Sequence, residues 1–346
     1  IRMHMNGYER ISAAFSGVET DRVPMMLHNF MSAASDIGMS IGEYRSRPEN
    51  IAKAHITAAR KYGLDGILLD IDTCLEAGAI GVPIELPEDA PARVIGAASK
   101  DIHELIEVMT PDKLLKYDRI KIMLEAVNLM KEEAGGEILI RGNCDQMAFS
   151  LAMLSYGMTD FLADLMDEDC CEKILALIER AYLVHLEFHK LMNEAGADIT
   201  SFGDSSCGPD LIGRDLYLKF SYPFQKKLQE DLTKLNIKTV CHICGNLDHI
   251  VNDVAGIGFA GVEVDYKTDI RNAATVLKGK SVMFGPIDPS GVFYFGTPEK
   301  VREETQKVLE IFRGRGLVIG AGCALPYGTP SANIQAFVDT VRSFRI

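Results

Sequence analysis

Short apolar runs alternate with longer amphipathic stretches along almost the whole chain. The short runs are rich in β-branched residues and apolar at successive positions, which is typical of strands that are covered on both faces. This pattern predicts eight strands, at residues 24–30, 66–72, 137–144, 198–204, 237–243, 261–266, 281–288 and 317–323.

The stretches between these runs repeat apolar residues at helical spacing. Several of them begin with Pro or Asp and end at Gly, which are signals for the start and the end of a helix. They predict helices at residues 48–63, 115–133, 166–192, 216–235 and 298–316. Eight strands alternating with helices in a chain of this length predict a (β/α)8 TIM barrel that forms a single domain over residues 1–346. A doubly wound sheet is the alternative, but no G-x-G-x-x-G follows the first strand.

Two segments depart from this alternation. Residues 81–99, "GVPIELPEDAPARVIGAAS", follow the second predicted strand and predict a β-hairpin or lid inserted at a βα loop. The opening residues 1–5, "IRMHM", are set aside as a segment that does not belong to the fold.

Composition narrows the classes of function. The net charge of −13 argues against binding of nucleic acid or of an anionic membrane by bulk electrostatics. No apolar run is long enough to span a bilayer, and no signal-peptide pattern opens the chain. Eight cysteines in such a chain are therefore expected to be reduced thiols of a cytoplasmic protein, and most of them to be buried.

In a barrel of this kind, the catalytic groups lie at the carboxyl ends of the strands and in the loops that follow them. The residues at these ends are accordingly the candidates for chemistry. They are His28, Asn29, Asp70, Asp72, Arg141, Asn143, Cys144, Asp145, Gln146, Asp204, His242, Cys244, Glu263, Asp265, Asp288 and Cys323.

Among these candidates, the fifth strand carries a histidine and a cysteine at alternate positions. Side chains at i and i+2 of a strand share a face, so His242 and Cys244 can converge, while Cys241 points toward the helices. Cys323 ends the eighth strand and can meet them across the mouth. One imidazole and two thiolates with an open fourth position form a known catalytic zinc arrangement, and thiolates favour zinc over magnesium or calcium. Three buried residues without a metal are the alternative.

Several segments together resemble the uroporphyrinogen decarboxylase superfamily over nearly the whole chain. They are "DRVPMMLHNF", "HICGN", "GFAGVEVDYK", "GPIDPSGVFYFGTPEKV" and "GAGCALPYGTPSANIQAFVDTV". Within that superfamily, the His-x-Cys-Gly and the later Gly-x-Gly-Cys are similar to the zinc motifs of the methylcobamide:coenzyme M methyltransferases and related corrinoid-dependent methyltransferases.

The decarboxylase branch of the superfamily fits less well. Its members carry an arginine-rich segment after the first strand, where this chain has "HNFMSAASDIG" without an arginine. Asp72 does occupy a position similar to the aspartate that those enzymes use. A decarboxylase that uses Asp72 is therefore the alternative function. A non-catalytic barrel that binds a small ligand or a corrinoid protein is a third hypothesis.

The resemblance implies a zinc ion held by His242, Cys244 and Cys323. It also implies transfer of a methyl group between a small molecule and the cobalt of a corrinoid. The small molecule would be an O-, S- or N-methyl substrate or a thiol acceptor. A separate corrinoid protein would dock at the barrel mouth. The oligomeric state is left open, and a homodimer is one alternative. The acidic surface slightly favours demethylation of a methyl ether. The expected catalytic residues are Asp72, Glu76 and Asp204; those expected to bind substrate are His28, Asn29, Asn143, Gln146, Glu263 and Tyr327. For Asp72, Glu76 and Asp204, a purely structural role is the alternative, and Asp204, Glu263 or Asp265 could orient His242.

Overall fold

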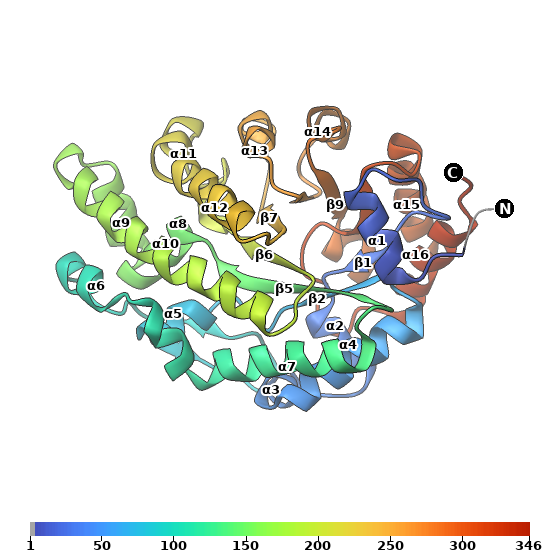
Figure 1. Ribbon diagram of the computed structural model, residues 1–346, viewed down its shortest axis with the longest axis horizontal. Helices are drawn as coiled ribbons and strands as arrows, with labels where there is room; N and C mark the ends of the chain where they lie inside the picture. Colours follow the sequence, from blue (N-terminus) through green and yellow to red (C-terminus); the bar gives the residue numbers. More distant parts are fainter. Residues whose placement is uncertain (1–3) are drawn as a thin grey trace.

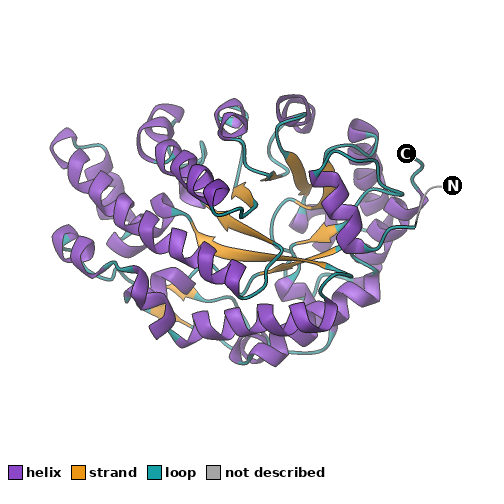
Figure 2. Ribbon diagram, in the orientation of Figure 1, coloured by secondary structure: helices purple, strands orange, loops and turns teal. Residues whose placement is uncertain are grey.

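The computed structural model describes residues 4–346, and in it a sheet of parallel strands is surrounded by helices (Figures 1 and 2). The strands pair in the order β1-β2-β5-β6-β7-β8-β9-β10, which is their order along the chain. A parallel bridge between Met25 and Ile319 joins the two edges, so the sheet closes into a barrel. The predicted (β/α)8 barrel and its eight strands are confirmed. The strands are β1 (Met26–Leu27), β2 (Gly66–Leu69), β5 (Leu139–Gln146), β6 (Ile199–Gly203), β7 (Thr239–Ile243), β8 (Gly261–Val264), β9 (Val282–Ile287) and β10 (Leu317–Ala321).

Helices fill the connections between the strands, and α4 and α7, for example, pack side by side in Figure 1. The α-helices are α1 (Gly7–Phe15), α2 (Phe30–Asp36), α3 (Ile41–Ser46), α4 (Pro48–Tyr62), α5 (Leu75–Ile80), α6 (Ile102–Val108), α7 (Asp118–Ala134), α8 (Ala148–Tyr156), α9 (Met158–Leu165), α10 (Cys171–Glu194), α11 (Arg214–Phe220), α12 (Tyr222–Lys234), α13 (Val251–Ile257), α14 (Ile270–Leu277), α15 (Pro298–Phe312) and α16 (Ser331–Ser343). Short 3-10 turns span Pro111–Lys116, Glu168–Cys170 and Ser205–Cys207, and a π-helical turn spans Pro289–Tyr294.

Local signals explain where these helices begin and end. Helix α4 begins at Pro48, where a missing N–H costs nothing, and ends before Gly63, whose φ of 64° is left-handed. The single helix predicted at 216–235 is wrong, because the chain breaks at Ser221 into α11 and α12. Pro223 lies in the first turn of α12, where its ring is tolerated, whereas it would disrupt the interior of a longer helix.

The irregular stretch at 81–99 contains the predicted hairpin as a two-stranded antiparallel ribbon, β3 (Ile84–Glu85) with β4 (Arg93–Val94). It follows α5 rather than β2 itself. A hydrogen bond joins it to α3, since Arg45 donates to the carbonyl of Ala90 at 3.0 Å. Its role as a lid over the mouth stays a prediction.

The two faces of each strand have different surroundings. Inward-facing apolar residues of the strands, such as Leu139 and Val240, form a small cluster on the barrel axis, and Ile11 of α1 belongs to that cluster. Helix α1 therefore seals the amino-terminal end of the barrel. The outward-facing residues join the large core under the helices. Toward the carboxyl ends, the inward positions become polar, so the barrel has an apolar floor and a polar upper layer.

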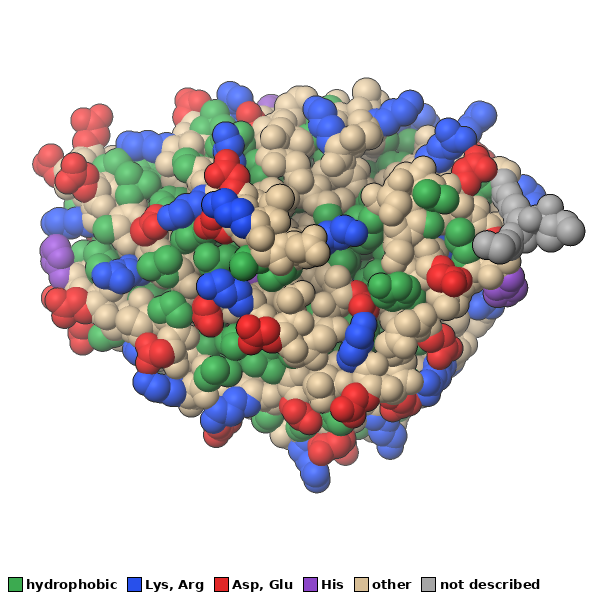
Figure 3. All heavy atoms as spheres, viewed as in Figure 1, with side chains coloured by type: hydrophobic (Ala, Val, Ile, Leu, Met, Phe, Trp, Pro, Cys, Tyr) green, Lys and Arg blue, Asp and Glu red, His purple; other side chains and the backbone are tan. Residues whose placement is uncertain are grey.

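The surface carries charged side chains of both signs. Figure 3 shows acidic and basic side chains interspersed over one face. Within residues 4–346, every helix is too short or too polar to cross a membrane. Of the opening segment set aside above, residues 1–3 lie outside the described part, whereas the amide of Met5 donates to Asp21 at 3.2 Å.

Candidate metal centre

Strand β7 places the first two soft ligands on the inside of the barrel. Val240 faces the apolar floor, and Cys241 and Ile243 pack into the core under the helices. The alternate residues His242 and Cys244 therefore face the interior, and His242 Nε2 lies 3.1 Å from Cys244 Sγ.

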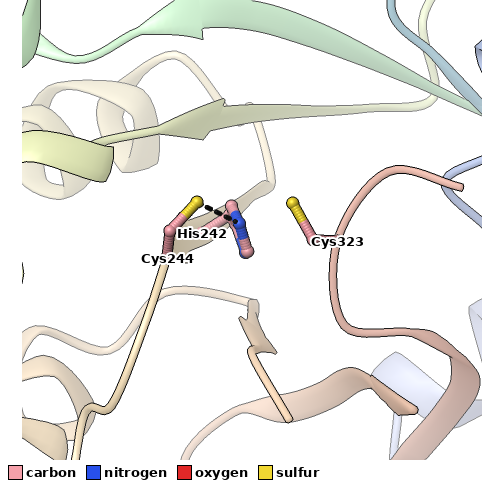
Figure 4. Close-up of side chains that lie close together, drawn as sticks. All are labelled: His242, Cys244 and Cys323. Carbon is pink, nitrogen blue, oxygen red and sulfur yellow. Dashed lines mark hydrogen bonds between the residues drawn. The ribbon is translucent and has the colours of Figure 1, made fainter. Parts of the chain in front are cut away.

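Cys323 reaches the same place from the end of β10 (Figure 4). One ligand atom each of His242, Cys244 and Cys323 lies within 4.8 Å of the other two. Glycines permit this approach: a Cβ on Gly320 would lie 1.9 Å from the carbonyl of Met26, and one on Gly322 would lie 2.8 Å from that of Val264. The predicted convergence of the three side chains is present, and its imidazole and two sulfurs fit a soft divalent metal such as zinc.

The protonation of the three groups suits metal binding. The hydrogen bond from the Cys323 thiol, supported by His242, lowers the pKa of Cys244 to about 3, while the same bond raises the pKa of Cys323 well above its usual value. Burial disfavours charge on His242, but the Cys244 thiolate and Glu263 outweigh it and raise its pKa to about 10. A thiolate, which is the form that binds metal, is thus present at neutral pH, and metal binding would release the protons of His242 and Cys323.

Glu263 of β8 stands behind the imidazole. His242 Nδ1 lies 3.2 Å from the Glu263 carbonyl oxygen and 3.6 Å from its carboxylate Oε1. Because Nδ1 donates to that carbonyl oxygen, His242 turns Nε2 toward the sulfurs, which is the arrangement of a metal-binding histidine oriented by a backbone carbonyl. The same Oε1 lies 3.6 Å from Nδ1 of His28, whose Nε2 bonds Asp70 at 2.8 Å. Glu263 and His28, both predicted to be site residues, are therefore neighbours in the structure.

The turn behind Cys244 is fixed by Asp265. Its carboxylate accepts from the Gly245 amide at 2.9 Å and from the Lys267 amide at 3.2 Å. Gly245 has a φ of 90°, and a Cβ there would come within 2.3 Å of Asp210 Oδ2. Glycine is therefore required at the turn that presents Cys244.

The other residues expected to bind substrate lie around the mouth with fewer contacts. Asn143 accepts from Ser201 at 3.3 Å, and Tyr327 donates its hydroxyl to the carbonyl of Met39 at 3.1 Å. Asn29 and Gln146 are buried at the ends of β1 and β5. Substrate contact by these four residues stays a prediction.

The three expected catalytic carboxylates are held by helices rather than by the metal donors. Asp72 pairs with Arg119 of α7 and accepts from the Cys74 amide at 2.9 Å. Asp204 accepts from the Ser221 hydroxyl and the Gln225 amide, both at 2.8 Å, and from Ser150. Glu76 is fully buried against His185 of α10 at 3.1 Å. These contacts explain why each carboxylate is buried, even if none of the three is catalytic. A catalytic role of Asp72, Glu76 or Asp204 stays a prediction.

Replacing Glu76 by glutamine tests its role. Burial raises the pKa of Glu76 well above its usual value and lowers the pKa of His185 to about 3, so burial favours the neutral form of both groups. A raised acid pKa means that, above about pH 4.5, the unfolded chain releases a proton that the folded chain keeps, so this group's contribution to stability falls as pH rises. Glutamine has no such loss. We expect the urea midpoint of Glu76→Gln to exceed that of the wild type by more at pH 8 than at pH 5, with methyl transfer within about threefold. A loss of activity with intact stability would instead support catalysis.

Ser205 was missed by the sequence-based prediction, and the partner of Arg141 was not foreseen. Ser205, directly after Asp204, places its hydroxyl 3.3 Å from Cys244 Sγ. Arg141 was one of many strand-end candidates, but its pairing with Glu263 was not expected. Its position between the inward-facing Leu139 and Asn143 was the available signal, because an arginine on the inner face of a barrel strand needs a buried partner.

The fold is a (β/α)8 barrel, and His242, Cys244 and Cys323 form a group at its mouth that could hold a metal ion. The chain belongs to the uroporphyrinogen decarboxylase family, whose model, described as Uroporphyrinogen decarboxylase (URO-D), matches residues 6–344. It is 28% identical to methylcobamide:CoM methyltransferase MtbA of Methanosarcina acetivorans, over 97% of this chain and 98% of that protein. It is 24% identical to a uroporphyrinogen decarboxylase of Chlorobium phaeovibrioides, over 85% and 84%. The resemblance to the methyltransferase branch is confirmed.

A solved structure shares the fold. A "methyltransferase from Methanosarcina mazei" superimposes with a TM-score of 0.89 over 98% of this chain and 99% of that one, at 24% identity. At that identity, the likeness establishes the barrel architecture and its length, and the chemistry has to come from the site.

Proposed function

We propose that this protein is a zinc-dependent methyltransferase that moves a methyl group between a small substrate and the cobalt of a corrinoid carried by a separate protein. The observation that carries the proposal is the convergence of His242, Cys244 and Cys323 within 4.8 Å. The similarity to methylcobamide:CoM methyltransferases over almost the full length supports it.

The chain's own residues prepare the site for this chemistry. Zinc held by the three side chains would bind the heteroatom of the substrate and stabilise its anion. Glu263 keeps the Nδ1 proton of His242 on the side away from the sulfurs, and Ser205 bonds Cys244 at 3.3 Å. His242 is only 7% exposed, so water has little access to its imidazole, whereas Cys244 and Cys323 are half-buried and can be reached from the mouth.

The substrate and the direction of transfer are the finer part of the proposal. The preference for a methyl ether rests on the acidic surface alone. The similarity to relatives named coenzyme M methyltransferases favours a thiol acceptor, because coenzyme M is a thiol. We therefore propose transfer from a methylcorrinoid to a thiol as the first direction to test, and demethylation of an ether as the second.

The test is an absorbance assay on the zinc-loaded protein. Methylcobalamin and cob(I)alamin absorb differently, so a panel of thiols and methyl ethers reveals transfer in either direction. Conversion that depends on a thiol or an ether and is lost on chelation supports the proposal. No conversion over the panel, or conversion that a chelator leaves unchanged, contradicts it.

A rim of exposed apolar side chains supports docking of a carrier protein at the mouth. The rim consists of Leu211, Tyr266, Phe295 and Tyr327, which lie on the loops after β6, β8, β9 and β10. All four loops follow carboxyl ends of strands, so the rim lies at the same end of the barrel as His242, Cys244 and Cys323.

Replacing Phe295, which is 78% exposed, by glutamate tests this docking. We expect kcat/KM with a corrinoid carrier protein to fall by about tenfold or more, because a charge enters an apolar contact. The rate with free methylcobalamin should change by less than about twofold, since free corrinoid needs no docking surface. Val18→Glu is the control, because Val18 is exposed between α1 and β1, at the other end of the barrel. Equal losses with free and protein-bound corrinoid would contradict docking through the rim.

The alternative, a decarboxylase that uses Asp72, has less support. The Asp72 carboxylate is engaged by Arg119 and by the Cys74 amide. Burial raises its pKa, and Arg119 only partly counters this effect. Decarboxylation by Asp72 does not require thiolates. The alternative therefore does not explain why His242, Cys244 and Cys323 converge.

A further inference from the structure

Strand β5 carries a buried cation in the polar layer of the barrel. The side chain of Arg141 is 2% exposed, and its Nη1 lies 2.5 Å from Glu263 Oε2. The guanidinium carbon lies 5.1 Å from the centre of the Phe284 ring, in the apolar floor. Arg141 is thus clamped between an aromatic face and one oxygen of a carboxylate.

Fixing that oxygen determines where the other one lies. Glu263 Oε1 is buried and lies 3.6 Å from Nδ1 of His242 and also 3.6 Å from Nδ1 of His28. The carboxylate therefore stands between one permanent cation and two imidazoles. Because a guanidinium is a permanent cation with donors in a fixed fork, Arg141 is the partner that holds Glu263 in this orientation.

Loss of the cation would change the support of His242. A buried carboxylate without its charged partner turns toward another donor, here His28. Oε1 would then no longer face His242 Nδ1. The imidazole would keep the hydrogen bond from Nδ1 to the Glu263 carbonyl oxygen at 3.2 Å but lose the carboxylate 3.6 Å away, the second of the two contacts that direct Nε2 toward Cys244 Sγ.

We propose that Arg141 is a positioning residue of the metal centre: it locks Glu263, and Glu263 presents the Nε2 of His242 for the metal. This inference rests on the proposed zinc site. It concerns a residue two side chains away from the metal donors, on a different strand from each of them.

Zinc affinity measured by competition with a chromophoric chelator tests the proposal without any assay of activity. We expect Arg141→Met to bind zinc about 10- to 100-fold more weakly than the wild type, the range seen when support of a metal ligand is removed. Arg141→Lys, which keeps the charge, should recover most of that loss. The matched control is Arg119→Met, which breaks another arginine–carboxylate pair, with Asp72, that makes no contact with the donors.

Circular dichroism and thermal unfolding show whether each variant folds. If Arg141→Met does not fold, Arg141→Gln replaces it, since glutamine retains an N–H donor without the charge, and a loss of tenfold or more is again expected. Zinc affinity of the folded neutral variant equal to that of the wild type would overturn the proposal, as would an equal loss in Arg119→Met. Absence of zinc binding by the wild-type protein is a different result, because it would refute the proposed function itself.

Discussion

Replacing Cys323 by alanine is expected to remove the metal from the protein. Zinc content should fall from about one ion per chain to nearly none, since a catalytic zinc site rests on three protein ligands. Methyl transfer should fall by at least about a hundredfold, because activation of the substrate depends on the bound metal. Metal analysis of the purified variant and the cobalamin assay measure the two effects.

The control for this experiment is Cys241→Ala. Cys241 precedes His242 directly in β7, is fully buried and belongs to the core under the helices. Its replacement removes a thiol from the same strand without touching the interior of the barrel, so zinc content should stay near one ion per chain. If Cys323→Ala kept its zinc while Cys241→Ala lost it, the assignment of the ligands would be wrong.

The convergence of His242, Cys244 and Cys323 could be predicted from the sequence because two simple rules govern it. Alternation along a strand separates Cys241 from His242 and Cys244. Closure of a parallel barrel brings the end of the last strand to the same mouth, so Cys323 becomes their partner in spite of the long separation in sequence. Both rules depend on backbone geometry, which apolar patterning specifies strongly.

The supporting residues could not be predicted in the same way. A carboxylate at a strand end can face the mouth or reach under a helix, and the choice depends on side chains that meet only after folding. Glu76 contacts His185 on α10, and Arg141 of β5 pairs with Glu263 of β8. Sequence spacing contains no rule for such pairs. The sequence therefore predicted a set of strand-end candidates of which only part belongs to the centre.

Asp204 gives the clearest test of this distinction. Its carboxylate is fully buried and accepts hydrogen bonds from the Ser150 hydroxyl at 2.7 Å and from Ser221 and Gln225 at 2.8 Å, which ties β6 to α8 and α12. Alanine would leave these buried donors unpaired, each at a cost of about 1–3 kcal/mol. We expect the free energy of unfolding of Asp204→Ala to fall by about 3 kcal/mol or more, measured by urea denaturation.

Asp204→Asn separates a structural role of this residue from a catalytic one. Asparagine keeps one oxygen acceptor and the size of the side chain, so we expect a smaller loss, about half that of alanine. Zinc affinity and methyl transfer should stay within about threefold of the wild type, because the carboxylate makes no contact with the three metal donors. A variant that kept its stability but lost zinc or activity would show that Asp204 acts on the centre after all. The hydrogen bonds from α8 and α12 would then serve to aim it rather than to hold the helices.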